Sequence, residues 1–396
     1  MIKTRIKVGF IVDDIDRPAM GTALYMQKLI EQYVTTFKDE VELVLIYREG
    51  NCRLLIPEIA RRLPIKKYNI PKFSGFFSFL RFFLTSREVF DIIHFPRPKL
   101  FPFFWKLKAK GFVVTFHDAP EENSTRFRTW HNYFFEWFIR LWGKYYIDVA
   151  IGDTKFAAKN ISRYFHIKES KTFGVVLAGG SNFKPLKPKE VKNKKHLLLE
   201  KYNIQQPYIL QVARLAPHKN VHRVIKAFDI LKKEKEKFPH QLVILGGREH
   251  APEYDKLVDK VIRESPYVQD IYIAPYIENE DMAAVYNLAD IFVQASLSEG
   301  FSIPIVDAFK AGVAVVCSNV SVFPEIVGDA AIQVNPFDQL SIAGGMKKLL
   351  TSSALRQEKI AKGFKKGREY SWERAAGDTI AIYLKVLNDK NYDELG

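Results

Sequence analysis

Short apolar runs alternate with longer amphipathic segments along the chain, and this alternation predicts strands and helices in a parallel α/β arrangement. The pattern occurs twice, because a polar stretch at residues 181–201 separates two series of strands. In the first series we expect strands at residues 7–12, 41–47, 91–94, 111–116, 148–151 and 172–177, and a helix at 22–34. In the second we expect strands at residues 208–212, 241–245, 271–273, 291–295, 313–318 and 330–334, and helices at 221–232, 281–288 and 303–311.

One stretch of the second series, residues 291–319, combines this pattern with candidate chemistry. A strand, a turn-rich loop, a helix and a second strand follow one another, and Gly312 stands where a helix C-terminus favours glycine. Glu299 lies just ahead of the helix N-terminus, whose free N–H groups can bind a phosphate, and Asp307 follows within the helix. Two carboxylates beside an anion site predict recognition of sugar hydroxyls, because carboxylates accept hydrogen bonds from them.

The composition is that of a folded protein with more than one domain. A chain of 396 residues exceeds what one hydrophobic core usually serves, and 47% hydrophobic with 27% charged residues is ordinary for globular proteins. No apolar run is long enough for a transmembrane helix, and the N-terminal sequence lacks the cleavage site of a signal peptide. Of the two cysteines, Cys52 and Cys317, the second lies in an apolar strand, which predicts a buried free thiol and a cytoplasmic setting.

Positive charge is concentrated in the first half of the chain. Residues 1–185 contain 30 Lys and Arg against 18 Asp and Glu, which accounts for +12 of the net charge of +15. This excess predicts an anionic partner for the first half: nucleic acid, a membrane surface or a phosphorylated substrate.

Two aromatic segments in the same half, residues 73–90 and 130–146, predict amphipathic helices. For the first, which is flanked by basic residues, core packing and an interfacial membrane role both stay open. We interpret the second as a helix that packs against the sheet. The expected apolar faces consist of Phe73, Phe76, Phe77, Leu80, Phe83 and Leu84 in the first segment and of Trp130, Phe134, Trp137 and Leu141 in the second.

Arg214 and Lys219 lie between the expected strand at 208–212 and the helix that follows it. A forked guanidinium and a compact ammonium suit a diphosphate that lies across strand ends. Arginine and lysine at this spacing after a strand are more often solvated surface residues. The interpretation as a diphosphate site therefore depends on the Glu299 loop in the same half of the chain.

The segments YILQVARLAPHKNVHRVIKAF, LVILGG and ASLSEGFSIPIVDAFKAGVAVVCSNVSVFPEIVGDAAIQVNPFD resemble the nucleotide-sugar-binding half of the retaining GT-B glycosyltransferases of family four. The resemblance is close over residues 205–375 and loose over the first half. It implies an α/β fold of two Rossmann-like domains that face each other across a cleft, with a C-terminal helix that crosses back to the first domain. We therefore expect an acceptor-binding domain at residues 1–185, a nucleotide-sugar-binding domain at 186–375 and the crossing helix at 376–396.

The resemblance also implies roles for single residues. Arg214 and Lys219 would bind the donor diphosphate and neutralise the leaving group, and Glu299 would hold sugar hydroxyls. Asp307 stands where the family has a second glutamate that binds the ribose. The other donor-site positions are Gly300, Phe301, Ser302 and Ile303, whose amides would lie beside Glu299, and Tyr276 and Ile277, which fall where the family lines its base pocket.

In the first half, MGTALYMQKL resembles the family's glycine-containing turn, so that the amide of Gly21 or Thr22 would face the cleft. His117 ends the strand GFVVTFHD, where a histidine is usually structural. Family members often have a histidine here that lines the donor-sugar and acceptor site, so we count His117 among the catalytic candidates. His94, at the end of DIIH, is interpreted as structural.

Asp14 and Asp16 have the spacing of the D-x-D metal pair found in the other glycosyltransferase fold. They follow the first expected strand, and the remaining motifs need no metal. We therefore assign them to the loop, and expect no metal and no cofactor besides the donor substrate.

These observations together predict a retaining, metal-independent hexosyltransferase of cell-envelope polysaccharide, lipopolysaccharide or glycolipid synthesis. The donor would be a nucleotide-diphosphate sugar, and GDAAIQVNPFD resembles mannosyltransferases, which favours GDP-mannose over UDP-sugars. The acceptor would be a saccharide on a polyprenyl diphosphate at the inner face of the cytoplasmic membrane, because the first half is aromatic and basic. Nucleic acid is not expected, since no RNA- or DNA-binding module is recognisable. Two alternatives stay open: a nucleotide-sugar epimerase of the same fold, and a non-catalytic nucleotide-sugar-binding partner.

Overall fold

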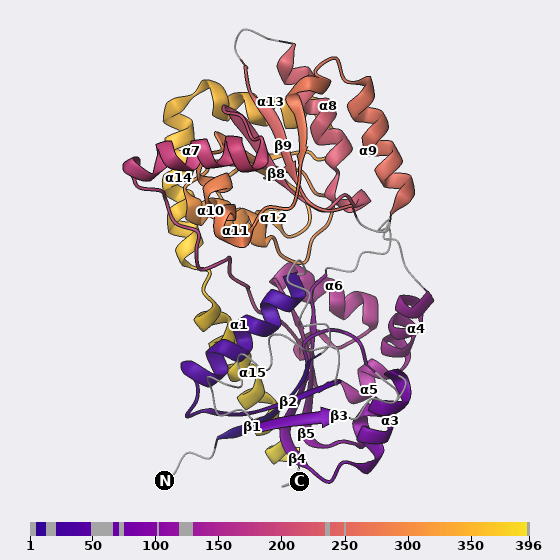
Figure 1. Ribbon diagram of the computed structural model, residues 1–396. Coiled ribbons are helices and arrows are strands. Elements are labelled where there is room, and N and C mark those ends of the chain that lie inside the picture. Colours follow the sequence, from indigo (N-terminus) through magenta and orange to yellow (C-terminus); the bar gives the residue numbers. More distant parts are fainter. Residues whose placement is uncertain are drawn as a thin grey trace. The chain divides into compact units, whose positions relative to one another are not determined.

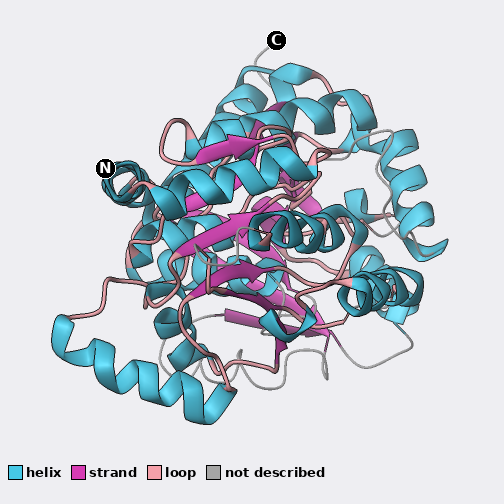
Figure 2. Ribbon diagram, turned by 90° about the horizontal axis from the view of Figure 1, so that it is seen from above, coloured by secondary structure: helices cyan, strands magenta, loops and turns pink. Residues whose placement is uncertain are grey.

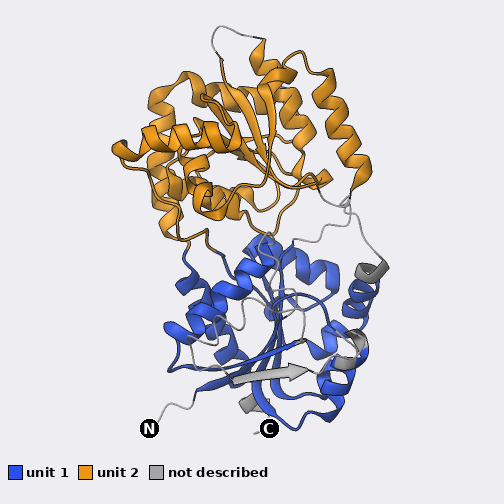
Figure 3. Ribbon diagram, viewed as in Figure 1, with its two compact units in different colours: residues 1–122, 128–177, 371–396 blue, residues 123–127, 178–370 orange. Residues whose placement is uncertain are grey.

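The computed structural model describes residues 5–12, 21–48, 66–70, 75–100, 103–118, 130–233, 238–248 and 251–393. The chain folds into two compact units (Figure 3). The first unit comprises residues 1–122, 128–177 and 371–396, and the second comprises residues 123–127 and 178–370. The expected boundaries after residues 185 and 375 thus differ from the division by contacts, which falls after residues 177 and 370.

The first unit is built on a seven-stranded parallel sheet that has helices on both faces (Figures 1 and 2). The strand order is β3-β2-β1-β4-β5-β6-β7, so the direction in which strands are added reverses between β1 and β4. The central strands are buried on both faces, as expected for apolar runs in a parallel sheet. The strands are β1 (Ile6–Val12), β2 (Val41–Arg48), β3 (Lys66–Ile70), β4 (Val89–Phe95), β5 (Lys108–Phe116), β6 (Val149–Gly152) and β7 (Thr172–Gly174).

The last helix of the chain belongs to this first unit, which confirms the expected return of the C-terminus. It packs on the first helix and on β5, and Val386 lies against Gly111 so closely that a Cβ there would be only 2.3 Å from its Cγ1. The helices are α1 (Gly21–Thr35), α3 (Gly75–Thr85), α4 (Trp130–Phe138), which continues through a π-helical turn (Ile139–Gly143) into α5 (Lys144–Tyr146), α6 (Lys155–Phe165) and α15 (Trp372–Asp393), with 3-10 turns at Phe104–Lys106 and Glu169–Lys171.

The second unit contains a six-stranded parallel sheet with the order β10-β9-β8-β11-β12-β13. Its strands are β8 (Tyr208–Val212), β9 (Gln241–Leu245), β10 (Ile271–Ala274), β11 (Ile291–Gln294), β12 (Val315–Ser318) and β13 (Ile332–Val334). Its helices are α7 (Pro188–Tyr202), α8 (Val221–Lys232), α9 (Pro252–Glu264), α10 (Asn279–Asn287), α11 (Ile303–Ala311), α12 (Phe323–Val327), α13 (Gln339–Thr351) and α14 (Ser353–Arg368), with 3-10 turns at Pro217–Lys219 and Val268–Asp270.

The expected strand, loop, helix and strand at residues 291–319 are confirmed as β11, α11 and β12. Pro304 lies in the first turn of α11, where its missing N–H costs no helical hydrogen bond. The helix ends at Gly312, whose φ of 78° is in the left-handed region that favours glycine. Cys317 is a buried free thiol in β12, as predicted.

The expected linker at residues 181–201 is largely wrong, because most of it forms helix α7. Pro188 provides the first turn, and the Glu190 side chain accepts a hydrogen bond from the Lys187 amide at the helix start. Leu198 and Tyr202 are buried, and the Tyr202 hydroxyl donates to Asp281 of α10 at 2.7 Å. A few apolar residues at helical spacing were enough to dock a segment whose composition is typical of a linker.

The expected apolar faces of the two aromatic helices also need correction. In α4 and the π-turn the residues that pack inward are Phe138 and Ile139, whereas Phe134, Trp137 and Leu141, the expected packing face, are exposed. In α3 the buried residues are Phe79, Phe82 and Phe83, and Phe77 and Leu84 are exposed. Among the described residues no helix combines the length and apolar character needed to cross a bilayer.

Candidate functional site

The residues predicted to carry chemistry in the second unit follow two adjacent strands, β8 and β11. The chain adds β9 and β10 on one side of β8 and then returns to place β11 on the other side, so the two loops diverge at the carboxyl ends of these strands. Such reversal points leave a crevice in which α/β proteins bind ligands. Arg214 and Lys219 follow β8, and Glu299 follows β11.

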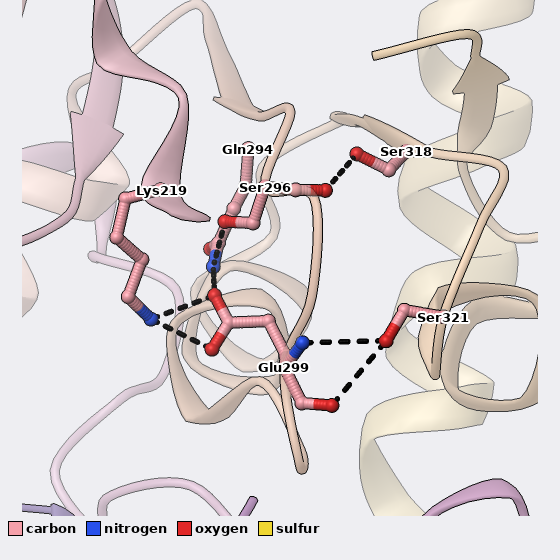
Figure 4. Close-up of polar contacts among 6 residues, drawn as sticks. All are labelled: Lys219, Gln294, Ser296, Glu299, Ser318 and Ser321. Carbon is pink, nitrogen blue, oxygen red and sulfur yellow. Dashed lines mark hydrogen bonds and ion pairs between the residues drawn. The ribbon is translucent and has the colours of Figure 1, made fainter. Parts of the chain in front are cut away.

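Glu299 is the centre of a polar cluster (Figure 4). The Lys219 ammonium donates to both of its carboxylate oxygens, at 2.7 Å to Oε1 and 2.6 Å to Oε2. Gln294 Nε2 donates to Oε1 at 2.9 Å. Glu299 is only 8% exposed, so these contacts fix the orientation of its carboxylate. An ammonium has three donors, and the contacts to Glu299 use two of those of Lys219.

The backbone of the Glu299 loop is held from two sides. The Glu299 amide donates to Ser321 Oγ at 3.3 Å, and the Ser318 hydroxyl donates to the carbonyl of Ser296 at 2.6 Å (Figure 4). Asn220 is buried at the start of α8 in a left-handed conformation, and its Nδ2 donates to the carbonyls of Ala295 and Pro336 at 2.8 and 2.7 Å. The loops after β8 and β11 are thus joined by direct hydrogen bonds.

The residues Gly300, Phe301, Ser302 and Ile303 lead from Glu299 into the N-terminus of α11. Phe301 is buried and contacts Tyr370 edge to face, with ring centroids 5.6 Å apart. Ser302 is the cap residue of α11, yet its side chain makes no cap hydrogen bond. Its buried hydroxyl finds no hydrogen-bond partner among the described residues. Buried hydroxyls are normally hydrogen-bonded, so this group is suited to a ligand at the helix N-terminus.

Asp307 lies one turn further along α11 and faces residues 179 and 180 of the same unit. Its Oδ1 accepts a hydrogen bond from the Gly180 amide at 2.7 Å, and a Cβ on Gly179 would come within 2.3 Å of the same oxygen. Burial raises the pKa of Asp307 to about 7, although the Gly180 amide and the charge of Lys310 oppose the shift. The second oxygen, Oδ2, makes none of these contacts.

The remaining donor-site candidates lie in the same unit. Arg214 is exposed just beyond β8. Tyr276 and Ile277 lie between β10 and α10, where the Tyr276 ring is exposed and the Ile277 side chain is buried.

In the first unit, Gly21 and Thr22 form the start of α1, where helix amides are free to bind an acceptor atom. The helix confirms the expectation at residues 22–34, with one more residue at each end. Asp14 and Asp16 lie outside the described residues. Within the described ranges, His, Cys, Asp and Glu side chains form no group of three or more that could hold a metal ion.

His117 is held by acceptors on both ring nitrogens. Nδ1 lies 3.1 Å from Asp153 Oδ2, and Nε2 lies 2.8 Å from the carbonyl of Pro96. Burial alone would lower the pKa of His117, but the charge and hydrogen bond of Asp153 outweigh burial and raise it. A ring with acceptors on both sides is satisfied as an imidazolium. Binding of a substrate by His117 would therefore require the exchange of one of these two contacts.

His94 is structural, as interpreted from the sequence. Its Nδ1 lies 2.6 Å from the hydroxyl of Tyr383 in α15, and its Nε2 lies 2.8 Å from Thr115 Oγ1. Burial lowers the pKa of His94 to about 3, so the ring is neutral at physiological pH.

Comparison with known proteins tests the resemblance. Residues 193–366 match the family "Glycosyl transferases group 1". The second unit is a glycosyl transferases group 1 domain. The matched range contains the Glu299 cluster and all the candidates that follow β8, β10 and β11.

Relatives extend the similarity over the whole chain. The chain is 26% identical over 399 residues to "O-antigen chain mannosyltransferase B" of Escherichia coli, covering 96% of this chain and 99% of the relative. It is 24% identical over 250 residues to "Serotype-specific mannosyltransferase WbdA" of Escherichia coli, of which it spans 30%. A solved glycosyltransferase from Rickettsia africae ESF-5 has the same fold, with a TM-score of 0.72, 16% identity and coverage of 97% of this chain and 99% of that one. The protein is a glycosyltransferase with the GT-B fold, as the resemblance implied.

Three residues of the site were not predicted from the sequence: Asn220, Gln294 and Ser321. Asn220 and Ser321 contact loops that are distant in sequence, whereas Gln294 donates to the carboxylate of Glu299, five residues further along the chain. The signal that existed was the Lys-Asn pair before α8, because asparagine tolerates the left-handed conformation that Asn220 adopts.

Proposed function

We propose that this glycosyltransferase moves mannose from GDP-mannose to a saccharide carried on a polyprenyl diphosphate, with retention of the anomeric configuration. The observation that supports this proposal most directly is the Glu299 carboxylate, oriented by Lys219 and Gln294 beside the N-terminus of α11. The choice of mannose rests on the mannosyltransferase relatives and on the resemblance of residues 328–338 to such enzymes.

In this proposal the donor lies at the carboxyl ends of β8 and β11. Arg214 and the third N–H of Lys219 bind the diphosphate, and Ser302 Oγ and the free amides of α11 bind the phosphate nearest the helix. Glu299 accepts hydrogen bonds from the mannose hydroxyls. Asp307 keeps Oδ2 for a ribose hydroxyl.

The other candidate residues contact the base of the donor and the acceptor in this proposal. The exposed ring of Tyr276 offers a stacking surface for the base beside Ile277. The amides of Gly21 and Thr22, together with His117, belong to the acceptor side of the reaction in the first unit.

The reaction proceeds without a protein nucleophile, because the carboxylates of the cluster are already engaged by Lys219, Gln294 and Gly180. The acceptor hydroxyl attacks the anomeric carbon on the face from which the diphosphate departs, and the departing phosphate oxygen takes up its proton. Positive charge from Arg214 and Lys219 stabilises the leaving group. Preorganised charge of this kind contributes about 3 to 4 kcal/mol per donor.

The test is an assay of the full chain with GDP-mannose and a polyprenyl-diphosphate-linked saccharide, followed by NMR determination of the anomeric configuration of the product. We expect an α-mannoside and a loss of about 10²- to 10³-fold in kcat for Arg214→Ala and Lys219→Ala. Lys226→Ala, which removes an exposed lysine from α8, is the matched control.

Three results would overturn the proposal. Normal turnover in both variants would remove the assignment of the diphosphate site. Release of an altered sugar nucleotide without acceptor would identify an epimerase, and donor binding with neither transfer nor hydrolysis would identify a non-catalytic partner.

A further inference from the structure

The continuous helix formed by α4, the π-turn and α5 carries an apolar stripe on its outer side. Trp137, Leu141 and Tyr145 are 57%, 45% and 67% exposed. They are spaced four residues apart, and Phe134, 36% exposed, continues the stripe one turn earlier. Side chains at this spacing lie on one face of a helix, so the exposed residues form a single line and are not scattered.

This stripe is not the packing face of the helix. Phe138 and Ile139 of the same helix are buried in the hydrophobic cluster of the first unit, and Phe134 stacks on Phe138 with ring centroids 6.4 Å apart. Trp105 stacks on Tyr146 with ring centroids 4.3 Å apart and on Phe138 with centroids 6.2 Å apart, and these contacts hold the helix against the first unit. The helix is therefore apolar on both sides, and only the inner side is explained by the fold.

Helix α3 extends the same kind of surface. Its Phe79, Phe82 and Phe83 belong to the hydrophobic cluster that also receives Phe138 and Ile139, so the two helices cover one side of the unit (Figure 1). Phe77 and Leu84, two turns apart on α3, are 64% and 56% exposed. We call Phe77, Leu84, Phe134, Trp137, Leu141 and Tyr145 the aromatic face.

Basic residues outnumber acidic ones on these two helices. Arg81 is exposed between Phe77 and Leu84, and Lys144 is exposed beside Tyr145, with its ammonium 4.8 Å from the ring centroid. Glu136 is the one carboxylate on the described parts of α3 and of the helix at residues 130–146, and it accepts a hydrogen bond from the Tyr164 hydroxyl at 3.1 Å. Tryptophan, phenylalanine and leucine flanked by Lys and Arg are typical of helices that lie in a membrane interface.

We propose that the aromatic face docks the enzyme on an anionic lipid bilayer, with the helix at residues 130–146 lying in the headgroup region. The cations favour anionic lipid over a neutral one, and a helix apolar on both sides can pack inward and insert outward at once. The proposed lipid-linked acceptor supplies the reason for docking, and the proposal rests on the proposed function in that respect alone. The docking itself depends on the first unit and is measured without catalysis.

The test is sedimentation of the full chain with vesicles of 30% phosphatidylglycerol in phosphatidylcholine and with vesicles of phosphatidylcholine alone. We expect binding to the anionic vesicles, weakened by salt, and a loss of at least about tenfold in the partition coefficient for the triple variant Trp137→Gln, Leu141→Gln, Tyr145→Gln. The control is Leu257→Gln, Leu340→Gln, Leu384→Gln, which replaces three exposed leucines on α9, α13 and α15 and is expected to bind normally.

A second measurement locates the contact. Lipids brominated near the headgroup should quench the tryptophan fluorescence of the wild type and quench that of the triple variant less. Vesicle binding unchanged by the triple substitution would overturn the proposal. So would concentration-dependent dimerisation that the triple variant abolishes, because the face would then bind a second copy of the chain. Transfer to a soluble saccharide should survive the triple substitution, so a failure of docking and a failure of the proposed reaction give different results.

Discussion

At the scale of single residues, the orientation of the Glu299 carboxylate is set by Lys219, which follows β8, and by Gln294 at the end of β11. Lys219 supplies charge and Gln294 a neutral donor, and both act on Oε1, whereas Oε2 is bound by Lys219 alone. The less constrained oxygen is the one best able to accept a hydrogen bond from a sugar.

Glu299→Gln tests this role. The amide leaves one acceptor where the carboxylate had two and removes the partner charge of Lys219, so we expect kcat/KM to fall about 10²-fold or more while GDP binding changes about threefold or less. Steady-state kinetics and calorimetry measure the two effects. Glu280→Gln, an exposed change on α10, should leave both unaltered, and a fall in GDP affinity as large as the fall in kcat/KM would contradict an action on the sugar.

Asp307 predicts a pH dependence of stability. Burial raises its pKa from 3.8 to about 7, so folding favours the protonated form, and the unfolding free energy should decrease as pH rises from about 4 through 7. Asp307→Asn keeps an acceptor for the Gly180 amide and removes the charge. We expect the variant to be about 4 kcal/mol more stable than the wild type at pH 8 and no more stable at pH 4. Urea unfolding at both pH values measures this, and an equal effect at both would refute the buried-charge explanation.

At the scale of secondary-structure elements, α15 is joined to the first unit by a buried hydrogen-bond chain. The Tyr383 hydroxyl lies 3.0 Å from the Tyr33 hydroxyl of α1 and 2.6 Å from His94 Nδ1 of β4. Thr115 Oγ1 of β5 continues the chain to the Tyr25 hydroxyl at 3.1 Å. The last helix of the sequence is therefore a structural part of the first unit.

Tyr383→Phe tests how much this series of buried hydrogen bonds contributes to the unfolding free energy. Removal of the hydroxyl leaves His94 and Tyr33 without a shared partner in a dry interior, which costs about 1 to 3 kcal/mol of unfolding free energy. Chemical denaturation measures the loss, and hydrogen exchange should show that it falls on the first unit. The control is Tyr145→Phe, which removes an exposed hydroxyl. A loss of the same size in both variants would contradict a role for the buried chain.

At the scale of the whole molecule, the Glu299 cluster and the aromatic face belong to different units. The second unit contains the Glu299 cluster and the match to glycosyl transferases group 1, and the first contains the aromatic face. Ligands of the donor site should therefore stabilise the second unit specifically.

A thermal-shift series tests which nucleotide binds. A ligand at 100 times its dissociation constant stabilises the protein by about 2.7 kcal/mol, so GDP should raise the unfolding temperature clearly and UDP should not. Arg214→Ala should abolish the GDP effect, and Lys226→Ala should retain it. A larger shift with UDP than with GDP would exclude GDP-mannose as the preferred donor.

The sequence by itself determined the strands other than β3 and the loop that carries Glu299, because these depend on local periodicity and on motifs within a few residues. Gly312 ended α11 where predicted, since the left-handed conformation depends on that residue alone. Three features were decided only by the tertiary structure: the partners of Glu299, the docking of α7 in place of a linker, and the outward direction of Trp137 and Leu141. The helix has apolar residues on more than one side, so its sequence does not show which of them is buried; that depends on the neighbours it meets.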